Sequence, residues 1–211
     1  INGALDLSRQ GLESVPEGVL ELKGLRKLDL SRNLLASLPV ELFDLEGLEY
    51  LHLSHNPLKQ IPTNISNLES IKDLWMGNLR ISKVPPALGA LSKLESLSLA
   101  ENKFKKIPGE LCELKTLKVL SLHDCPLLTK IPDNIGNLHS LRYLILVNSP
   151  IKQFPDSITN LDLAGLILTK KQSSHLNSKQ IKWLQRIEKK DKKRKIKYKN
   201  YFRTLSNQFY E

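Results

Sequence analysis

The sequence has little cysteine, few aromatic residues and no long apolar run. Its 211 residues include two cysteines, too few for the disulfide framework of a small secreted scaffold. No stretch approaches the roughly 20 apolar residues that a membrane-spanning helix requires. The sequence also lacks a glycine-rich phosphate loop and any Cys/His cluster with metal-ligand spacing. We therefore expect no transmembrane segment, no cofactor and no metal ion.

What the sequence does contain is a pattern that returns every 23 residues. Residues 25–39 read LRKLDLSRNLLASLP, with leucine at the first, fourth and sixth positions, asparagine at the ninth and Leu-Pro at the end. The same pattern begins again at Leu48 and at Leu94. A fixed period of this length indicates a repeat architecture, in which each repeat is one unit of a stack.

The central Leu-x-Leu of each repeat predicts a short strand. Side chains alternate along a strand, so the two leucines face one side and the residue between them faces the other. Such a strand is not stable alone, but copies stacked edge to edge form one parallel sheet over a shared core. The asparagine ends the strand in a tight bend, because its amide can both donate and accept hydrogen bonds there.

Several repeats depart from this pattern. The repeat that starts at Ile71 has Leu79 at the asparagine position, and two later repeats have Cys125 and Ser149 there. The eighth repeat is compressed and has no asparagine. The chain opens inside a partial repeat whose strand nothing upstream covers, so we expect it to be a fragment of a longer protein.

The pattern resembles the leucine-rich repeat family, in its 23-residue intracellular class, which includes Ras-linked plant and animal proteins and bacterial relatives. The resemblance covers residues 4 to about 169. It implies an α/β solenoid of about eight repeats, a curved right-handed superhelix with short parallel strands on the concave face and irregular or helical segments on the convex face. It also implies a non-catalytic protein–protein interaction module, either a signalling scaffold or a bacterial host-directed protein.

The two cysteines favour a reducing compartment. Cys112 and Cys125 fall on opposite sides of the predicted coil, which is a poor geometry for a disulfide, and we expect both to be reduced core residues. The cysteine-rich end caps of extracellular relatives are also missing. We therefore expect a cytoplasmic protein, while secretion or delivery into a host cell stays open because the true N-terminus can lie upstream.

The sequence divides into three parts with different charge. Residues 1–169 hold the repeats, residues 170–188 predict a capping helix, and residues 189–211 form a basic tail with aromatic residues, which we expect to continue as a helix. The repeats carry 18 Lys and Arg against 19 Asp and Glu, whereas residues 170–211 carry 14 against 3. The predicted repeat domain is therefore close to neutral.

The predicted capping helix covers the last repeat, as in similar bacterial proteins. Asn177 or Ser178 is expected to be its N-cap. Ile181, Leu184 and Ile187 lie on one helical stripe and are expected to face the repeats.

The residues between and beside the strand leucines are predicted to line the concave face. Two groups of rings, at Tyr50, His52 and Trp75 and again at Tyr143, stand about 14 Å apart with small residues between them. Exposed aromatic side chains of this kind are frequent anchors of protein interfaces, although a solvated sheet face with Trp75 covering its neighbours is an open alternative. The predicted partner-binding residues are Tyr50, His52, His55, Asp73, Trp75, Ser98, Glu101, Ser121, His123, Tyr143 and Ile145.

Catalysis is not expected from this face. His52 and His123 lie about 14 Å apart, too far to share a metal ion. His123 and Asp124 with a nearby serine, Ser98 or Ser121, form the nearest approach to a hydrolytic set. A flat sheet face provides neither an oxyanion hole nor a pocket that excludes water.

The basic tail gives a second hypothesis, binding of nucleic acid or an anionic surface. Lysines neutralise phosphates, and the neighbouring rings can stack on bases. A charged segment that only solubilises the protein is the alternative interpretation. The residues concerned are Lys189, Lys190, Lys192, Lys193, Arg194, Lys195, Lys197 and Lys199. The sequence identifies neither the partner protein nor the oligomeric state.

Overall fold

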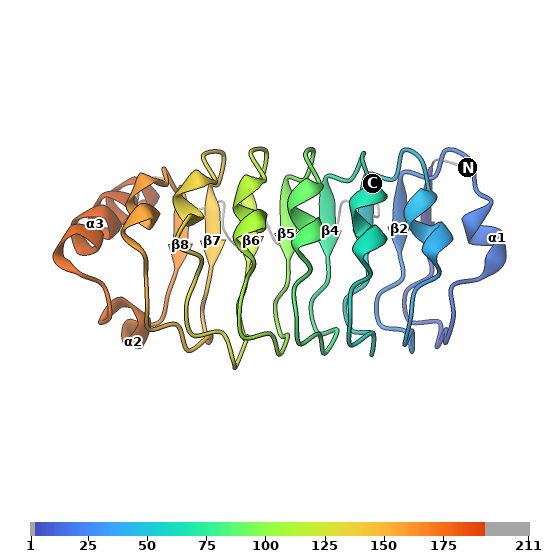
Figure 1. The fold of residues 1–211 in the computed structure, drawn as a ribbon, viewed down its shortest axis with the longest axis horizontal. Helices are drawn as coiled ribbons and strands as arrows, with labels where there is room; N and C mark the ends of the chain where they lie inside the picture. Colours follow the sequence, from blue (N-terminus) through green and yellow to red (C-terminus); the bar gives the residue numbers. More distant parts are fainter. Residues whose placement is uncertain (1–2, 193–211) are drawn as a thin grey trace.

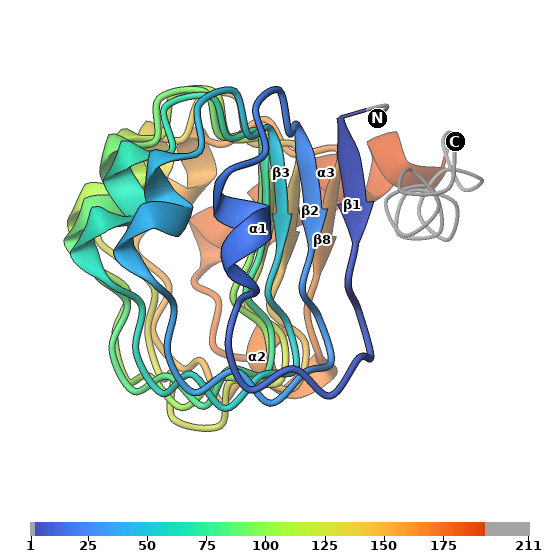
Figure 2. The same ribbon diagram turned by 90° about the vertical axis from the view of Figure 1, so that its right-hand side faces the viewer.

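Eight short parallel strands stack in sequence order to form one open sheet (Figure 1). The computed structural model describes residues 3–192. The predicted α/β solenoid is confirmed, with the strands on one side and short helices on the other (Figure 2). The strands are β1 (Ala4–Asp6), β2 (Lys27–Asp29), β3 (Tyr50–His52), β4 (Asp73–Trp75), β5 (Ser96–Ser98), β6 (Val119–Ser121), β7 (Tyr143–Ile145) and β8 (Gly165–Ile167).

The sheet keeps equivalent positions of successive repeats in register. Leu28 pairs with Leu51, 23 residues later, as the period predicts. Leu120 pairs with Leu144, 24 residues later, so the extra residue of this repeat lies outside the strands. It lies in the loop after β6, where Leu127 is 44% exposed.

Short helices form the convex side of the solenoid. Except in η5, the residue before each of these helices is a proline with an extended backbone, whose fixed φ suits the entry to the turn. Successive helices approach closely: a Cβ atom at Gly89 in η3 would clash with the carbonyl oxygen of Glu110 in η4. The convex helices are α1 (Glu17–Leu20), η1 (Val40–Asp44), η2 (Thr63–Asn67), η3 (Pro86–Ala90), η4 (Gly109–Glu113), η5 (Ile135–Asn137) and η6 (Asp156–Asn160).

The core lies between the sheet and the convex helices. The strand leucines Leu28 and Leu30 are fully buried, as are the rings of Phe43 and Phe104. Both cysteines are free and fully buried, as predicted. Burial raises the pKa of the Cys112 thiol to about 12 and that of Cys125 to about 11, so neither is a reactive thiolate at neutral pH.

A buried asparagine joins each regular repeat to the one before it. The amide nitrogen of Asn102 donates to the carbonyls of Leu99 in its own repeat and Met76 in the preceding one, at 2.9 and 2.8 Å. Its amide oxygen accepts from the backbone N–H groups of Leu79 and Ile81. Asn33 makes the equivalent four bonds, and Asn56 makes two donations and accepts from the backbone N–H of Leu35, which confirms the predicted role of this position.

Other side chains occupy the asparagine position in the irregular repeats. Leu79 is fully buried at this position, and its side chain has no atom that can form a hydrogen bond. The thiol of Cys125 donates to the carbonyl of Leu99 at 3.5 Å. Ser149 donates to the carbonyl of Leu122 at 2.7 Å and accepts from the backbone N–H of Cys125.

In the eighth repeat, the side-chain amide of a glutamine in the following helix takes the place of the asparagine amide. Gln172 lies in α2 (Lys170–Ser173) and is 3% exposed. Its amide nitrogen donates to the carbonyls of Leu146 and Ser149, each at 2.7 Å. Thr169 and Gln172 also form a reciprocal capping box.

The C-terminal helix α3 (Ser178–Lys192) packs on β8 and η6. Its first turn is capped as predicted, because Asn177 and Gln180 bond reciprocally to each other's backbone N–H. The predicted apolar stripe is wrong at Ile181, which is 42% exposed. The buried face is centred on Trp183 instead, whose indole N–H donates to the carbonyl of Leu161 at 2.9 Å. Ile187 shares this buried face, and Ile181 faces away from it.

Each of the first seven strands is followed, three residues later, by a non-glycine residue in the left-handed backbone conformation. This conformation aims the backbone N–H at the next repeat: that of Glu101 bonds the carbonyl of His123 at 2.9 Å. Left-handed backbone costs about 1 kcal/mol for most residues, so the stack imposes it. The residues are Arg9, Arg32, His55, Asn78, Glu101, Asp124 and Asn148.

Candidate functional site on the concave face

The register places the last residues of the strands in one row across the concave face. Asp29 lies opposite His52, and His52 lies opposite Trp75. The row continues through Ser98 and Ser121. The predicted site residues on these strands therefore share one surface.

The most densely connected part of this row is a cluster around His52. Its Nδ1 lies 3.1 Å from the Oδ2 of Asp29. Its ring centroid lies 5.8 Å from the indole of Trp75 and 6.3 Å from the phenol ring of Tyr50, which meets it edge-on. Asp29 was not among the predicted site residues, although it stands one period before His52 in the same column.

Asp29 is held as a carboxylate by its neighbours. Burial of the group acts to raise its pKa, but the hydrogen bond and charge of His52 and the bonds from Ser31 together lower the pKa below its usual value. One of these is the backbone N–H of Ser31, 2.8 Å from Oδ1. Asp73, by contrast, has its pKa raised, chiefly by burial.

The predicted aromatic wall is less exposed than the sequence indicates. Tyr50 is 7% exposed, whereas His52 and Trp75 are half-buried. Ser121 and Ile145 are also buried, at 2% and 3%. In a parallel sheet equivalent side chains stand about 4.8 Å apart, so each covers part of the next.

Two buried polar atoms of this row have no hydrogen-bond partner. Among the described residues, the only buried side-chain nitrogen or oxygen atoms without one are the Nε1 of Trp75 and the Oγ of Ser121. Both belong to the last residues of strands, β4 and β6, two repeats apart. A buried polar group without a partner costs about 1–3 kcal/mol, so the fold carries this cost at two positions of the row.

The remaining predicted residues lie near the ends of the strands. The amide nitrogen of Asn78 contacts the Nδ1 of His55 at 3.2 Å and donates to Glu101 at 3.3 Å, which links three repeats. The pKa of His55 is lowered, first by burial and then by the charge of Arg32. Tyr143 lies on β7, next to the middle residues of that strand.

The histidines do not form a recognisable catalytic or metal site. The Nδ1 of His123 lies 2.7 Å from the Oδ2 of Asp124. The Oγ of Ser121 contacts no hydrogen-bond partner, so it is not joined to His123 as a nucleophile to its base. Within residues 3–192 no three His, Cys, Asp or Glu side chains are grouped so that they could hold a metal ion.

The predicted basic tail lies almost wholly beyond the described part of the chain. Lys189 is an exposed residue of α3, and Lys190 and Lys192 are described through their backbone only. Lys193, Arg194, Lys195, Lys197 and Lys199 lie outside the described residues. No helix in the described part is long and apolar enough to cross a bilayer.

Comparison with known families identifies the repeats. The leucine-rich repeat family matches residues 4–58, and it matches again at residues 93–114 and 116–138. The chain is a leucine-rich repeat protein. The family and the structures similar to it are typically non-catalytic binding modules.

Solved structures of leucine-rich repeat proteins resemble this chain over most of its length. A leucine-rich repeat protein of Leptospira interrogans is 26% identical, with a TM-score of 0.64 over 79% of this chain and 54% of its own. An internalin of Listeria monocytogenes is 27% identical, with a TM-score of 0.62, over 79% of this chain and 80% of its own. The plant peptide hormone receptor RGFR1, solved in complex with RGF2, is 28% identical, with a TM-score of 0.62, over 74% of this chain and 27% of its own.

These relatives differ in size from this leucine-rich repeat protein. The match spans about half of the Leptospira protein and about a quarter of the plant receptor. A search of curated proteins found no match.

Proposed function

We propose that this leucine-rich repeat domain is a non-catalytic interaction module that binds an extended segment of a partner protein on its concave face. The observation that carries the proposal is the pair of half-buried rings of His52 and Trp75, with centroids 5.8 Å apart on the concave face. Two polar atoms of the same row, Trp75 Nε1 and Ser121 Oγ, are covered and without partners in the unbound chain, so a peptide backbone bonds them only when these side chains turn outward. The two strands concerned are about 10 Å apart, a span that three or four extended residues cover.

The half-buried rings supply the apolar part of such a site. The indole of Trp75 lies against His52, which Asp29 orients. A rigid, partly buried tryptophan with an unused donor has the properties of an interface anchor. His55, Asp73, Glu101 and His123 then form a polar rim for specificity.

Two of the similar structures support a ligand of this class, because each is a complex. The plant receptor RGFR1 was solved with RGF2, and PEPR1, 29% identical over 74% of this chain, was solved with AtPEP1. We infer for this chain a similar class of ligand, a peptide or an extended protein segment. A role as a signalling scaffold or as a host-directed protein is compatible with that ligand.

A reducing, cytoplasmic location fits the same proposal. Cys112 and Cys125 are free, buried and far from reactive, with pKa values raised to about 12 and about 11. Disulfides are rare in that compartment, and this domain is built without one.

The test is a peptide selection against the intact chain, followed by affinity measurements on the selected peptides. Replacing Trp75→Phe keeps an aromatic ring but removes the N–H, and we expect about tenfold weaker binding. Trp75→Ala removes the ring as well, and we expect a loss of about 30-fold or more. Glu113→Ala, on the convex side, is the matched control and leaves affinity unchanged.

Thermal unfolding of each variant separates binding from stability. Peptides that bind wild type and the Trp75→Ala variant equally well, with both proteins folded, would show that the concave centre is not the site. Selected peptides that lose affinity only with Glu113→Ala would move the site to the convex side.

A further inference from the structure

One side of the solenoid carries cations without acidic partners. Five successive repeats each contribute the segment between the end of the strand and the convex helix, namely residues 56–62, 79–85, 102–108, 125–132 and 149–155. These segments contain no Asp or Glu, and all of their Lys and Arg residues are exposed. We name this surface the basic flank; its cations are Lys59, Arg80, Lys83, Lys103, Lys105, Lys106, Lys130 and Lys152.

The opposite side of the solenoid has mixed charges in ion pairs. Glu49 binds both Arg26 and Lys72, at 2.9 and 2.8 Å, and Lys118 binds Glu95 at 2.6 Å. In the part of the chain that the structure describes, no residue of the basic flank takes part in an ion pair. The near-neutral repeat domain is therefore divided into one neutralised flank and one positive flank.

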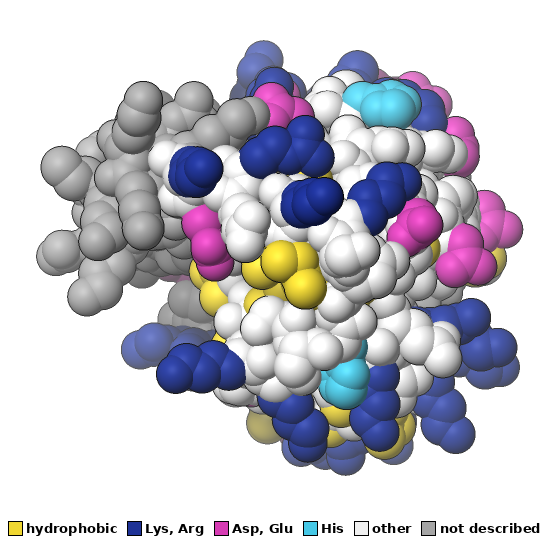
Figure 3. Space-filling model, turned by 90° about the vertical axis from the view of Figure 1, so that its left-hand side faces the viewer, with side chains coloured by type: hydrophobic (Ala, Val, Ile, Leu, Met, Phe, Trp, Pro, Cys, Tyr) yellow, Lys and Arg dark blue, Asp and Glu magenta, His cyan; other side chains and the backbone are white. Residues whose placement is uncertain are grey.

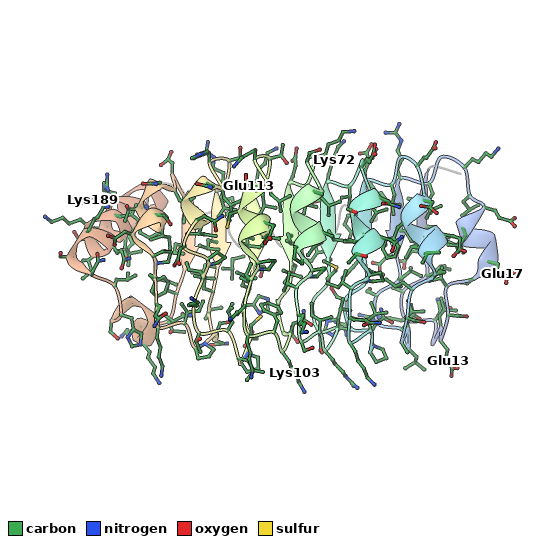
Figure 4. The ribbon with its side chains drawn as sticks, in the orientation of Figure 1. Glu13, Glu17, Lys72, Lys103, Glu113 and Lys189 are labelled. Carbon is green, nitrogen blue, oxygen red and sulfur yellow. The ribbon has the colours of Figure 1, made fainter. Side chains whose placement is uncertain are left out.

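The figures show this division. In Figure 4 the side chain of Lys72 lies at the upper edge and that of Lys103 at the lower edge, where Glu13 of the first repeat, outside the basic flank, is also labelled. In Figure 3, seen from the C-terminal end, Lys and Arg side chains crowd the lower part of the view, where no acidic side chain is visible. The basic flank spans four strand spacings, about 19 Å.

The nearest acidic groups lie at the borders of the basic flank. Asp124 is bonded to His123, and Glu101 accepts from Asn78, both toward the concave face. Asp133 follows the flank toward the convex helices. These groups do not interrupt the row of lysines.

The chemistry of the basic flank favours a surface of diffuse negative charge over a nucleic acid. Seven of its eight cations are lysine, a hydrated point charge, whereas arginine is the residue that binds phosphates bidentately. The flank has no exposed ring on which a base could stack, since Phe104 is buried and Phe154 is half-buried. A bilayer with anionic headgroups presents diffuse charge and requires neither feature.

An apolar side chain projects from the same surface. The extra residue of the sixth repeat lies in the segment that carries Leu127, which is 44% exposed between Pro126 and the buried Leu128. An exposed apolar group among lysines is the arrangement of interfacial membrane-binding segments, in which it enters the headgroup region.

We infer that the basic flank is a docking surface for an anionic lipid bilayer. The lysines hold the flank against the headgroups, and Leu127 inserts between them. The concave face is adjacent to this flank and stays open at a right angle to the membrane, so a docked domain still binds its partner. The inference is independent of the proposed partner-binding function.

The experiment is cosedimentation of the full 211-residue chain with vesicles of one-third phosphatidylserine in phosphatidylcholine. The flank variant combines Lys103→Gln, Lys105→Gln, Lys106→Gln and Lys130→Gln. A lysine near an anionic surface is worth about 1 kcal/mol, which is about fivefold in affinity. We expect the variant to bind about 100-fold or more weakly, and wild type to lose binding as salt rises.

The matched control removes the same number of charges from the opposite flank, by Lys72→Gln, Lys93→Gln, Lys115→Gln and Lys118→Gln. We expect it to keep affinity within about threefold. Both variants retain the basic tail and have equal net charge, so a contribution of the tail is the same in each. Circular dichroism confirms that both are folded.

Four outcomes would overturn the inference. They are no binding of wild type to the anionic vesicles, equal binding to pure phosphatidylcholine, equal losses in the two variants, and tighter binding to nucleic acid that displaces the vesicles. A loss confined to the flank variant supports it. A further loss with Leu127→Gln at high salt, where charge is screened, supports insertion of that side chain.

Discussion

The repeats with asparagine and the repeats without it differ in how the backbone groups after each strand find hydrogen-bond partners. At Asn102 a single side chain satisfies two carbonyls and two backbone N–H groups of adjoining repeats. At Ser149 one hydroxyl donates once and accepts once. At Gln172 the amide comes from a helix beyond the repeat.

The difference teaches that the fold requires the hydrogen bonds around this position more than it requires asparagine. Beside Leu79, whose side chain supplies none, Asn56 and Asn102 bond the carbonyls of Leu53 and Met76. A carbonyl at the end of a buried strand must find a donor, and a thiol, a hydroxyl or a distant amide can supply one. The number of bonds nevertheless falls from the asparagine repeats to Ser149. We therefore expect the cost of substitution to fall in the same order.

The largest effect is expected at Asn102. Asn102→Ala removes five hydrogen bonds, the fifth being to the carbonyl of Ala100. It leaves buried backbone groups unpaired, which we expect to lower the free energy of unfolding by about 4 kcal/mol. Urea unfolding measures it, with Asn160→Ala, an exposed residue of η6, as the control. A loss below about 1 kcal/mol would mean that the asparagine network does not hold the repeats together.

A smaller effect is expected at Gln172. Gln172→Ala removes the two bonds to the carbonyls of Leu146 and Ser149 and one half of the capping box, for which we expect a loss of roughly 2–3 kcal/mol. Hydrogen exchange should show the loss in β8 and α3 rather than in β2. Gln185→Ala, at an exposed site of α3, is the control. Equal protection in β8 for both variants would show that Gln172 does not replace the asparagine.

The smallest effect, with the opposite sign, is expected at Cys125. Cys125→Asn restores a strong donor and acceptor in place of a weak thiol, and we expect a gain of about 1 kcal/mol, seen as a higher Tm. Cys112→Asn, at the other buried cysteine, is the contrasting control and should destabilise, because that site has no strand-end carbonyls to satisfy. A lower Tm for Cys125→Asn would show that the extra residue has changed the shape of this bend.

The sequence predicts most of the fold because its period encodes the contacts. The leucines of β2 and the asparagine Asn33 lie where the pattern predicts, and the helix cap at Asn177 follows from local hydrogen-bonding chemistry. The sequence does not predict the role of Gln172, because this residue reaches the asparagine position from outside the 23-residue pattern. Trp183 replaces Ile181 on the buried face, where its large ring is covered and its N–H bonds the carbonyl of Leu161.

The sequence predicts which residues of the candidate site share a row, but it does not predict which hydrogen bonds they form. The period places His52 and Trp75 in one row, yet it does not show that Asp29 holds the histidine. Nor does it show that Trp75 Nε1 and Ser121 Oγ are left without partners, since that depends on what every neighbour bonds. The basic flank is equally invisible in the net charge, because the opposite flank cancels it.

The asparagine bonds also define how the molecule responds to force. The amides of Asn33, Asn56 and Asn102 each donate to a carbonyl 26 residues earlier. Each of these hydrogen bonds holds one repeat against the preceding one. Tension applied to the two ends would break these hydrogen bonds one after another, and each step would release 23 residues, or about 80 Å of contour length. The stack then lengthens one repeat at a time, and the repeats at its C-terminal end, which are joined by weaker hydrogen bonds, separate first.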